Sequence, residues 1–336
     1  MKRNMSQWLS SLPTAIAKKP LPLLSFPCVS LLGVTVRELI SQSELQAKGM
    51  LAVAKRTDSA AAVSFMDLSL EAECFGATIN LSDHEVPTVK GRLIDSTEKA
   101  TALEVPAARS GRTGIYIDAI SKASRLISDR PVIAGIIGPF SLAARLLDVS
   151  EIMIDCYDDP DMVHTVLEKA AVFLSDLARA YKAAGADGIV MAEPVAGLLS
   201  PDLEREFSAP YVKRIVDGVR DDSFAVIYHN CGNNTPLILE SLLSNGCDAY
   251  HFGNAADMER ILAAAPSDKL ILGNIDPAGT FRMGTPDKVR SETLALLEKC
   301  SKYPGFVLSS GCDVPPMTPW ENIDAFFAAA REFYGE

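Results

Sequence analysis

Short apolar runs rich in β-branched residues alternate along the chain with longer amphipathic stretches. Several of the runs are apolar at consecutive positions, as strands buried on both faces should be. The predicted strands span residues 21–26, 61–67, 131–138, 188–193, 224–229, 249–253, 270–275 and 306–310. Between them apolar residues recur at helical spacing, which predicts helices over residues 160–184, 200–220, 235–244, 257–265, 286–299 and 319–333.

Eight buried strands that alternate with helices favour a (β/α)8 TIM barrel. A doubly wound open sheet is the alternative, and it is weakened because no G-x-G-x-x-G turn follows any of the strands. Residues 69–129 are too long for one helix, and we expect a hairpin or lobe inserted there, after the second strand. Residues 1–20 read as an N-terminal extension. Because no linker rich in Gly, Ser or Pro interrupts the chain, we expect a single domain over residues 1–336.

Composition narrows the classes of partner. Hydrophobic residues make up 48% of the 336 positions, which is ample for one large core, and the net charge is -11. A negative surface repels phosphate backbones, so we expect no nucleic-acid partner. We also expect no membrane span, because no run of about 18 apolar residues occurs. The seven cysteines are scattered and odd in number, and no signal peptide is apparent, so we expect a reduced, cytoplasmic protein.

Reactive side chains lie just beyond two of the predicted strands. The fifth strand runs into His229 and Cys231, and the eighth is followed by Cys312. Side chains alternate along an extended chain, so His-x-Cys presents two ligands on one face, and both strand ends meet at the mouth of a closed barrel. One nitrogen and two sulfurs suit Zn²⁺ and leave one position open, as in a catalytic site. The sequence therefore predicts a zinc site, although cysteine is also a common small core residue.

The residues around these candidate ligands resemble the uroporphyrinogen decarboxylase superfamily. The motifs that carry the resemblance are HNCGN at residues 229–233 and GCDVPPMTPWEN at 311–322, with further matches at 67–73, 192–196, 199–201 and 273–277. Together they extend over most of the chain, from about residue 21 to 334. The Gly-Cys and Thr-Pro-x-Glu-Asn stretch is shared across the superfamily, whereas the His-x-Cys pair is similar to its methylcobamide:coenzyme M methyltransferase branch.

This resemblance implies a TIM barrel that binds Zn²⁺ and transfers a methyl group from a methylated corrinoid to a thiol. The corrinoid would be a co-substrate carried by a partner corrinoid protein. The acceptor would be coenzyme M, another small thiol or tetrahydrofolate. The resemblance also directs attention to further polar groups at the strand ends. Glu193 would be a weak fourth ligand or a hydrogen-bond acceptor at the metal, His251 would contact the acceptor, and Asp276 would line the pocket; each is also compatible with a structural role.

Two alternatives stay open, namely a decarboxylase-type tetrapyrrole enzyme and a corrinoid-binding barrel without turnover. The decarboxylase branch holds substrate carboxylates with N-terminal arginines, but here no arginine lies between Arg3 and Arg37. A polyanionic substrate needs cationic groups, so their absence argues against decarboxylation. Asp67 matches the aspartate with which the decarboxylases hold pyrrole N–H groups, and it therefore does not separate the two branches.

Overall fold

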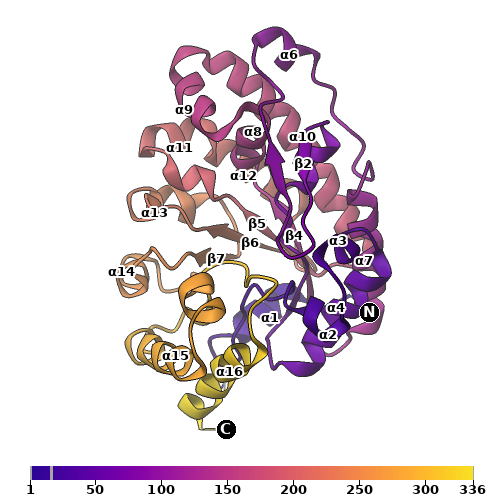
Figure 1. Cartoon of the computed structure of the whole chain (residues 1–336). Coiled ribbons are helices and arrows are strands. Elements are labelled where there is room, and N and C mark those ends of the chain that lie inside the picture. The colour runs from indigo at the N-terminus through magenta and orange to yellow at the C-terminus, as the bar shows by residue number, and fades with distance from the viewer. Residues whose placement is uncertain (1, 16–17, 336) are drawn as a thin grey trace.

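The structure, a computed structural model, describes residues 2–15 and 18–335. Within these residues seven parallel strands form one curled sheet in the order β1-β4-β5-β6-β7-β8-β9. The strands are β1 (Ala62–Val63), β4 (Val132–Ile137), β5 (Gly188–Ala192), β6 (Ala225–Asn230), β7 (Ala249–Phe252), β8 (Leu270–Ile275) and β9 (Phe306–Ser310). They fan around the centre of the molecule with helices outside them (Figure 1). The fold is TIM-barrel-like, in agreement with the class predicted from the pattern.

Residues 21–26, predicted as the first strand, form no strand in the described part of the chain. Pro20 and Pro22 flank Leu21 and have no N–H to donate, so a regular ladder cannot form there. The segment still connects the two edges of the sheet. The Leu21 N–H donates to the carbonyl of Leu308 in β9, and the Ala60 N–H, just before β1, donates to the Pro20 carbonyl. The prediction of eight regular strands is therefore corrected to seven strands and one proline-interrupted segment.

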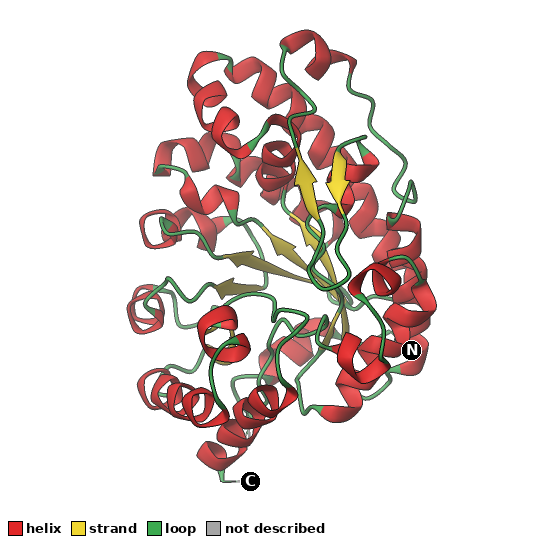
Figure 2. Ribbon diagram, in the orientation of Figure 1, coloured by secondary structure: helices red, strands yellow, loops and turns green. Residues whose placement is uncertain are grey.

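The helices form the outer layer (Figure 2). They are α1 (Met5–Ser11), α2 (Cys28–Leu32), α3 (Val36–Ile40), α4 (Ser43–Arg56), α5 (Leu70–Cys74), α6 (Thr97–Ala102), α7 (Thr113–Leu126), α8 (Pro139–Leu147), α9 (Val149–Asp158), α10 (Pro160–Ala184), α11 (Pro201–Phe207), α12 (Ala209–Val219), α13 (Thr235–Ser244), α14 (Met258–Ala264), α15 (Pro286–Cys300) and α16 (Trp320–Tyr334). The short turns η1 (Val195–Leu198) and η2 (Pro277–Arg282) follow β5 and β8. No helix in residues 2–15 or 18–335 is long and apolar enough to cross a bilayer.

Two helical features differ from the pattern-based expectation. The helix predicted over residues 200–220 is broken at Ser208 into α11 and α12. Pro210 explains the break, because proline lacks the N–H needed inside a continuous helix but is tolerated in a first turn. The helices α8 and α9 were not predicted, and α8 matters for the site because it begins directly after β4.

Alternate residues of the strands point inward and form a separate core inside the sheet. This inner core contains Val190, Ile227 and Leu272, all buried. Met5 and Leu9 of α1 join it, and the Met5 N–H donates to the Asp222 carbonyl just before β6. The expected N-terminal extension thus contributes a helix that covers the end of the barrel where the strands begin, and the opposite end stays available for a site.

The segment over residues 69–129 combines a hairpin with part of the outer layer. Strands β2 (Thr78–Asn80) and β3 (Thr88–Lys90) pair antiparallel, and they are drawn in front of the larger sheet (Figure 2). After β3, the N–H groups of Leu93 and Ile94 both donate to the carbonyl of Leu146, which ties the hairpin to the end of α8. Helix α7, by contrast, packs against α4 and α10 in the outer helical layer.

Candidate metal centre

His229 and Cys231 continue the inward-facing alternation of β6. Ala225 and Ile227 belong to the inner core, so the next side chain of that register, His229, lies directly above it and is 2% exposed. Cys312 lies two residues after the end of β9, and the curl of the sheet brings it close to His229 and Cys231. The ligand atoms of these three residues all lie within 4.8 Å of one another, and Cys312 Sγ is 3.4 Å from His229 Nε2.

The distance between Cys312 and His229 agrees with the spacing of donors in a zinc site. Bond lengths of about 2.3 Å to sulfur and 2.0–2.1 Å to nitrogen place the donors of a tetrahedral site about 3.5 Å apart. The distance of 3.4 Å between Cys312 Sγ and His229 Nε2 agrees with that value. The residues therefore fit a zinc ion with one coordination position left for another ligand, and the metal itself stays a prediction.

The two thiols have unequal acidities. Hydrogen bonding between the Cys231 and Cys312 sulfurs lowers the pKa of Cys231. The same hydrogen bond, together with burial, raises the pKa of Cys312 to about 12. Cys231 is therefore the first of the pair to become a thiolate, and a metal that binds both sulfurs must displace the Cys312 proton.

Close backbone packing fixes the Cys231 loop. The side-chain oxygen of Asn230 accepts hydrogen bonds from the Gly232 N–H at 3.0 Å and from the Thr235 hydroxyl at 2.7 Å. A Cβ on Gly253 would lie only 2.5 Å from the Cβ of Cys231, so this position tolerates no side chain. Because its neighbours hold it on both sides, the Cys231 sulfur is positioned before any ligand binds.

A buried chain of hydrogen bonds sets the proton position on His229. The Ser309 hydroxyl donates its one proton to the Leu21 carbonyl at 2.7 Å, so Ser309 Oγ must accept from His251 Nε2, also at 2.7 Å. Burial lowers the pKa of His251 well below its usual value, so this ring is neutral and its Nδ1 accepts from His229 Nδ1 at 2.8 Å. We assign the lone pair of His229 to Nε2, the atom that faces Cys312, as a metal ligand requires.

The structure gives His251 a different place from the one expected. Its side chain is fully buried beneath His229, and it does not border the cavity above the cluster. It therefore cannot touch an acceptor there, and it acts on the cluster through His229. Ser309 was missed by the sequence reasoning. It occupies an inward-facing position near the end of β9, and the strand register that carries the argument for His229 also points to it.

Glu193 is also placed differently from the expectation of a fourth ligand. Its buried carboxylate accepts hydrogen bonds from the Phe140 N–H at 2.6 Å and the Ser141 N–H at 3.1 Å, at the start of α8. A Cβ on Gly138 would lie 2.1 Å from a Glu193 oxygen, so glycine makes this contact possible. Burial raises the pKa of Glu193 to about 8 in spite of these donors. The carboxylate caps a helix instead of facing the sulfurs.

Asp276 faces away from the cluster as well. Its side chain accepts from the N–H groups of Ala278 and Gly279 and so begins η2. It borders a separate hollow together with Asn274 and Lys288, whereas the cavity above His229 is lined by other residues. The structure thus does not bring Asp276 together with the candidate ligands.

Asp67 is fully engaged inside the protein. One carboxylate oxygen contacts the Arg112 guanidinium at 2.5 Å and the Tyr116 hydroxyl at 3.2 Å, and the other accepts from the Ser69 hydroxyl at 2.6 Å. Arg112 also pairs with Glu73 at 2.6 Å. Because its acceptor positions are occupied, Asp67 has little capacity to accept hydrogen bonds from a substrate.

A cavity of about 470 Å³ lies above the cluster, with His229, Cys231 and Cys312 among its lining residues. The rest of its wall is largely apolar and contains Leu23, Met66, Leu68, Val86, Pro87, Ala192, Pro194, Pro315 and Pro316. Charged groups also border it. Glu85, on the β2–β3 loop, pairs with Arg282 at 2.8 Å, and Arg145 and Asp313 complete the set. Sequence reasoning missed Arg145, because outer-layer helices of a barrel normally face away from its mouth.

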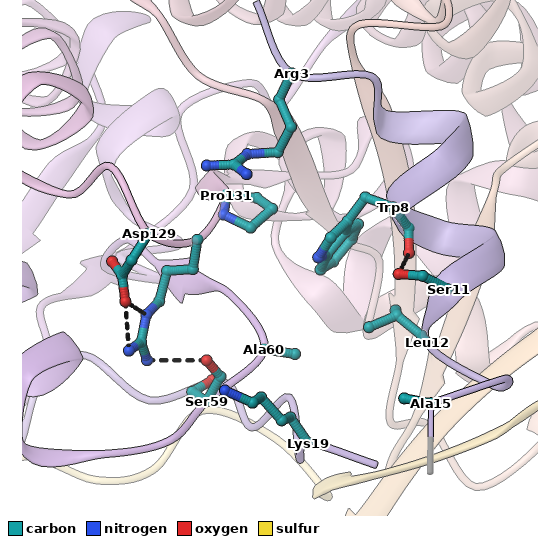
Figure 3. A pocket seen from close by; sticks show the side chains of 11 residues that line it. Arg3, Trp8, Ser11, Leu12, Ala15, Lys19, Ser59, Ala60, Asp129 and Pro131 are labelled. Carbon is teal, nitrogen blue, oxygen red and sulfur yellow. Dashed lines mark hydrogen bonds and ion pairs between the residues drawn. The ribbon is translucent and has the colours of Figure 1, made fainter. Parts of the chain in front are cut away.

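A second hollow, of about 230 Å³, lies at the opposite end of the barrel. Trp8 of α1 and Leu12, the residue after this helix, line it together with Arg3 and Pro131 (Figure 3). Its described lining residues include no cysteine or histidine. Arg130, also at this hollow, donates to Asp129 and to nearby backbone carbonyls. This end therefore offers no metal-binding donor set.

Comparison with known proteins matches residues 28–333 to the family model described as uroporphyrinogen decarboxylase (URO-D). A methylcobamide:CoM methyltransferase, MtbA of Methanosarcina mazei, is 27% identical over 80% of this chain and 78% of its own. A uroporphyrinogen decarboxylase of Hydrogenovibrio crunogenus is also 27% identical, over 88% of this chain and 85% of its own. Overall identity thus does not separate the two activities.

Solved structures agree on the fold. A methyltransferase from Methanosarcina mazei superposes with a TM-score of 0.86 at 26% identity, covering 99% of this chain and 100% of its own. A B12-independent methionine synthase from Shewanella superposes with a TM-score of 0.58 at 15% identity, over 96% and 98% of the two chains, and at that identity shares the fold alone.

Proposed function

The chain belongs to the uroporphyrinogen decarboxylase (URO-D) family, and within it we propose a zinc-dependent methyltransferase that moves a methyl group from a methylated corrinoid to a thiol. The observation that carries the proposal is the cluster of His229, Cys231 and Cys312, whose ligand atoms lie within 4.8 Å of one another beneath an open cavity. Zinc held there would lower the pKa of an acceptor thiol and so supply a thiolate at neutral pH. Relatives named methylcobamide:CoM methyltransferases support the same reaction class.

The transfer balances without an external oxidant or reductant. A bond forms between the acceptor sulfur and the methyl carbon, and the cobalt–carbon bond breaks with both electrons left on cobalt as Co(I). The thiol proton leaves to solvent. The protein contributes position and environment: the His251–Ser309 chain orients His229, and apolar residues such as Leu23 and Met66 keep water away from the reacting sulfur.

We propose a corrinoid protein as the methyl-carrying partner. Exposed apolar side chains near the cavity support a docking role. Leu198 follows β5 on η1, Met283 follows the cavity residue Arg282, and Met317 follows Pro316, with exposed fractions of 47%, 77% and 47%. Apolar residues at the rim of a pocket are typical of partner surfaces. Coenzyme M, another thiol and tetrahydrofolate are the candidate acceptors. All seven cysteines are free, and we propose the cytoplasm as the compartment.

Decarboxylation of a tetrapyrrole is less compatible with the site. A uroporphyrinogen decarboxylase is as similar in sequence as the methyltransferases, so this reaction has to be considered. However, Asp67 is already paired with Arg112 at 2.5 Å and has little capacity left to bind a substrate. Residues 21–33, where that branch has arginines, contain none. A corrinoid-binding barrel without turnover would have no need for the cluster of His229, Cys231 and Cys312.

The experiment that tests the proposal is methyl transfer under defined metal loading. Zinc-loaded and zinc-free protein would be given methylcobalamin, or a methylated corrinoid protein, with coenzyme M, homocysteine or tetrahydrofolate in parallel. We expect zinc-dependent loss of the methylcobalamin spectrum with at least one acceptor and no conversion of uroporphyrinogen. If neither donor is demethylated with any acceptor, or if uroporphyrinogen is decarboxylated, the proposed reaction is wrong.

A further inference from the structure

One cation of the mouth cavity has no counter-charge. Arg145, in the last turn of α8, borders the same cavity as His229, Cys231 and Cys312. Among residues 2–15 and 18–335, no carboxylate lies within 4.0 Å of its guanidinium and no acceptor takes a hydrogen bond from it. Burial lowers the pKa of Arg145, and no neighbouring charge offsets this effect.

The other arginines near the barrel mouth are already satisfied. Arg282 contacts both carboxylate oxygens of Glu85, at 2.8 and 3.3 Å. Arg112 pairs with Asp67 at 2.5 Å and with Glu73 at 2.6 Å. Partly buried guanidinium groups are normally paired, because desolvation of an unpaired charge is costly. The unpaired donors of Arg145 are therefore the exception that needs an explanation.

The fold holds Arg145 at the cavity wall. The backbone carbonyl of Leu146, the next residue, accepts from the N–H groups of both Leu93 and Ile94, which ties the end of α8 to the chain that leaves β3. Val86 and Pro87 of the β2–β3 loop and Thr88 of β3 line the cavity together with Arg145. This contact makes an outer-layer helix part of the pocket, and it fixes the position of the arginine relative to the hairpin.

We propose that Arg145 is the residue that binds the anionic group of a sulfonate-, carboxylate- or phosphonate-bearing thiol and so selects such an acceptor over neutral thiols. A guanidinium donates two parallel hydrogen bonds to such oxyanions, a geometry that an ammonium cannot reproduce. The apolar wall suits a short methylene linker between the anion and the sulfur, and about 470 Å³ is in the usual range for a small-molecule site. This inference rests on the proposed function and specifies its substrate.

The test compares acceptors of similar length and different charge. With methylcobalamin as donor, kcat/KM would be measured for 2-mercaptoethanesulfonate and 3-mercaptopropionate, for neutral 2-mercaptoethanol and for cationic cysteamine. We expect the wild type to prefer the anionic thiols. Arg145→Gln should lower kcat/KM for them by about 10- to 100-fold and change that of 2-mercaptoethanol by less than about threefold. Arg145→Lys should keep part of the preference, and Arg125→Gln, at an exposed site on α7, should keep all of it.

A binding measurement separates this inference from the proposed reaction. Ethanesulfonate carries the anion without the thiol, and calorimetry should detect its binding to the wild type but not to Arg145→Gln. If that difference is found while no thiol demethylates methylcobalamin, the Arg145 site stands and the proposed reaction fails. If transfer occurs and Arg145→Gln leaves the ratio of anionic to neutral rates unchanged, the Arg145 inference is overturned and the reaction stands. Zinc content and thermal unfolding of each variant show that the fold is intact.

The corrinoid is the other source of an anion, because methylcobalamin carries a phosphodiester. Methylcobinamide lacks that group and distinguishes the two sources. We expect Arg145→Gln to lose its preference for anionic thiols with either donor. A loss of rate that is equal for all thiols, and that is seen with methylcobalamin but not with methylcobinamide, would assign Arg145 to the corrinoid and overturn its assignment to the acceptor.

Discussion

The two ends of the barrel hold hollows of different chemistry. At the mouth, a cavity of about 470 Å³ is lined by His229, Cys231, Cys312 and the unpaired Arg145. At the opposite end, Trp8 of α1 and Leu12 just after this helix line a hollow of about 230 Å³ (Figure 3). Cations border both hollows, so positive charge alone does not distinguish a binding site.

Most cations at the closed end are already paired within the protein, although Arg3 Nε there has no hydrogen-bond partner in the described residues. Arg130, at the closed end, donates to Asp129 and to the Thr57 and Ser59 carbonyls, and Lys19 pairs with Asp58 at 2.6 Å. Such groups have little left to offer a ligand. At the mouth, Arg145 borders the cavity without a hydrogen-bond partner in the described residues, and His229 Nε2 faces the Cys312 sulfur. The functional end is therefore distinguished by side chains that are still free to bind a ligand, and not by its charge.

The largest effect is expected from removing a candidate metal ligand at the mouth. Cys312→Ala should lose most of the bound zinc, and both it and His229→Ala should slow methyl transfer by at least about 100-fold, because two remaining donors hold the metal weakly. Zinc stoichiometry after dialysis and the rate of methylcobalamin demethylation are the measurements. Cys156→Ala, on α9 and outside the cluster, is the matched control. Full zinc content in Cys312→Ala would show that the ligand assignment is wrong.

A smaller effect is expected beneath the cluster. Ser309→Ala and His251→Phe remove the groups that orient His229, and such partners typically contribute about 10- to 100-fold to metal affinity. Competition with a chelator measures that affinity. Nitrogen NMR of metal-free protein should show the proton of His229 on Nδ1 in the wild type and a mixture of tautomers in the variants. Ser310→Ala is the control, because the Ser310 hydroxyl oxygen accepts from the Leu23 N–H and not from a histidine. Equal zinc affinity in Ser309→Ala and Ser310→Ala would contradict the assigned chain.

Strand periodicity explains how much of this site the sequence could reveal. His229 and Cys231 are two residues apart at the end of a run of buried residues, so one register argument places both at the mouth. Cys312 follows from the same argument applied to β9. The fold class also follows from the alternation of strands and helices, although Pro20 and Pro22 prevent the first predicted strand from forming a ladder.

Tertiary contacts explain what the sequence could not reveal. Glu193 ends a strand as a ligand would, yet the adjacent start of α8 offers its carboxylate two backbone donors. Asp276 finds its partners within its own turn. Arg145 belongs to the cavity only because a hairpin distant in sequence folds against α8. Local residue patterns carry no information about which of several donors a carboxylate or guanidinium will meet.

A third prediction concerns the buried carboxyl of Glu71, which lies beside the last residue of β4. Burial raises the pKa of Glu71 to about 8; one of its oxygens accepts from the Ile137 N–H, and the other has no partner in the described residues. A carboxyl whose pKa is higher in the folded than in the unfolded chain stabilises the fold at low pH. That stability, on the order of 5 kcal/mol, is lost as pH rises from about 4.5 through about 8.

Urea unfolding at pH 5, 7 and 9, at constant zinc loading, measures this dependence. Glu71→Gln should remove the share of Glu71 in this dependence, because the amide stays neutral at every pH, and should leave the share of Glu193, whose pKa burial also raises to about 8. Glu298→Gln, at an exposed position of α15, should leave it unchanged. An identical pH dependence in the wild type and Glu71→Gln would show that Glu71 is ionised in the folded protein at neutral pH.

The smallest effect on catalysis is expected at the closed end, and it tests the comparison directly. Arg130→Gln removes hydrogen bonds to the Thr57 and Ser59 carbonyls and to Asp129, so it should lower the free energy of unfolding by about 1–3 kcal/mol. Because these donors are committed to the fold, kcat/KM with an anionic thiol should stay within about twofold of the wild-type value. Arg145→Gln should show the opposite pattern, with little change in unfolding and a large loss for anionic thiols, because its donors support no contact in the folded chain. Thermal unfolding and acceptor kinetics on the two variants, prepared side by side, decide the matter. Arg130→Gln could instead impair the use of anionic thiols as strongly as Arg145→Gln. In that case, whether an arginine is already hydrogen-bonded within the protein would not predict its role in acceptor binding, and the proposed distinction between the two ends would be wrong.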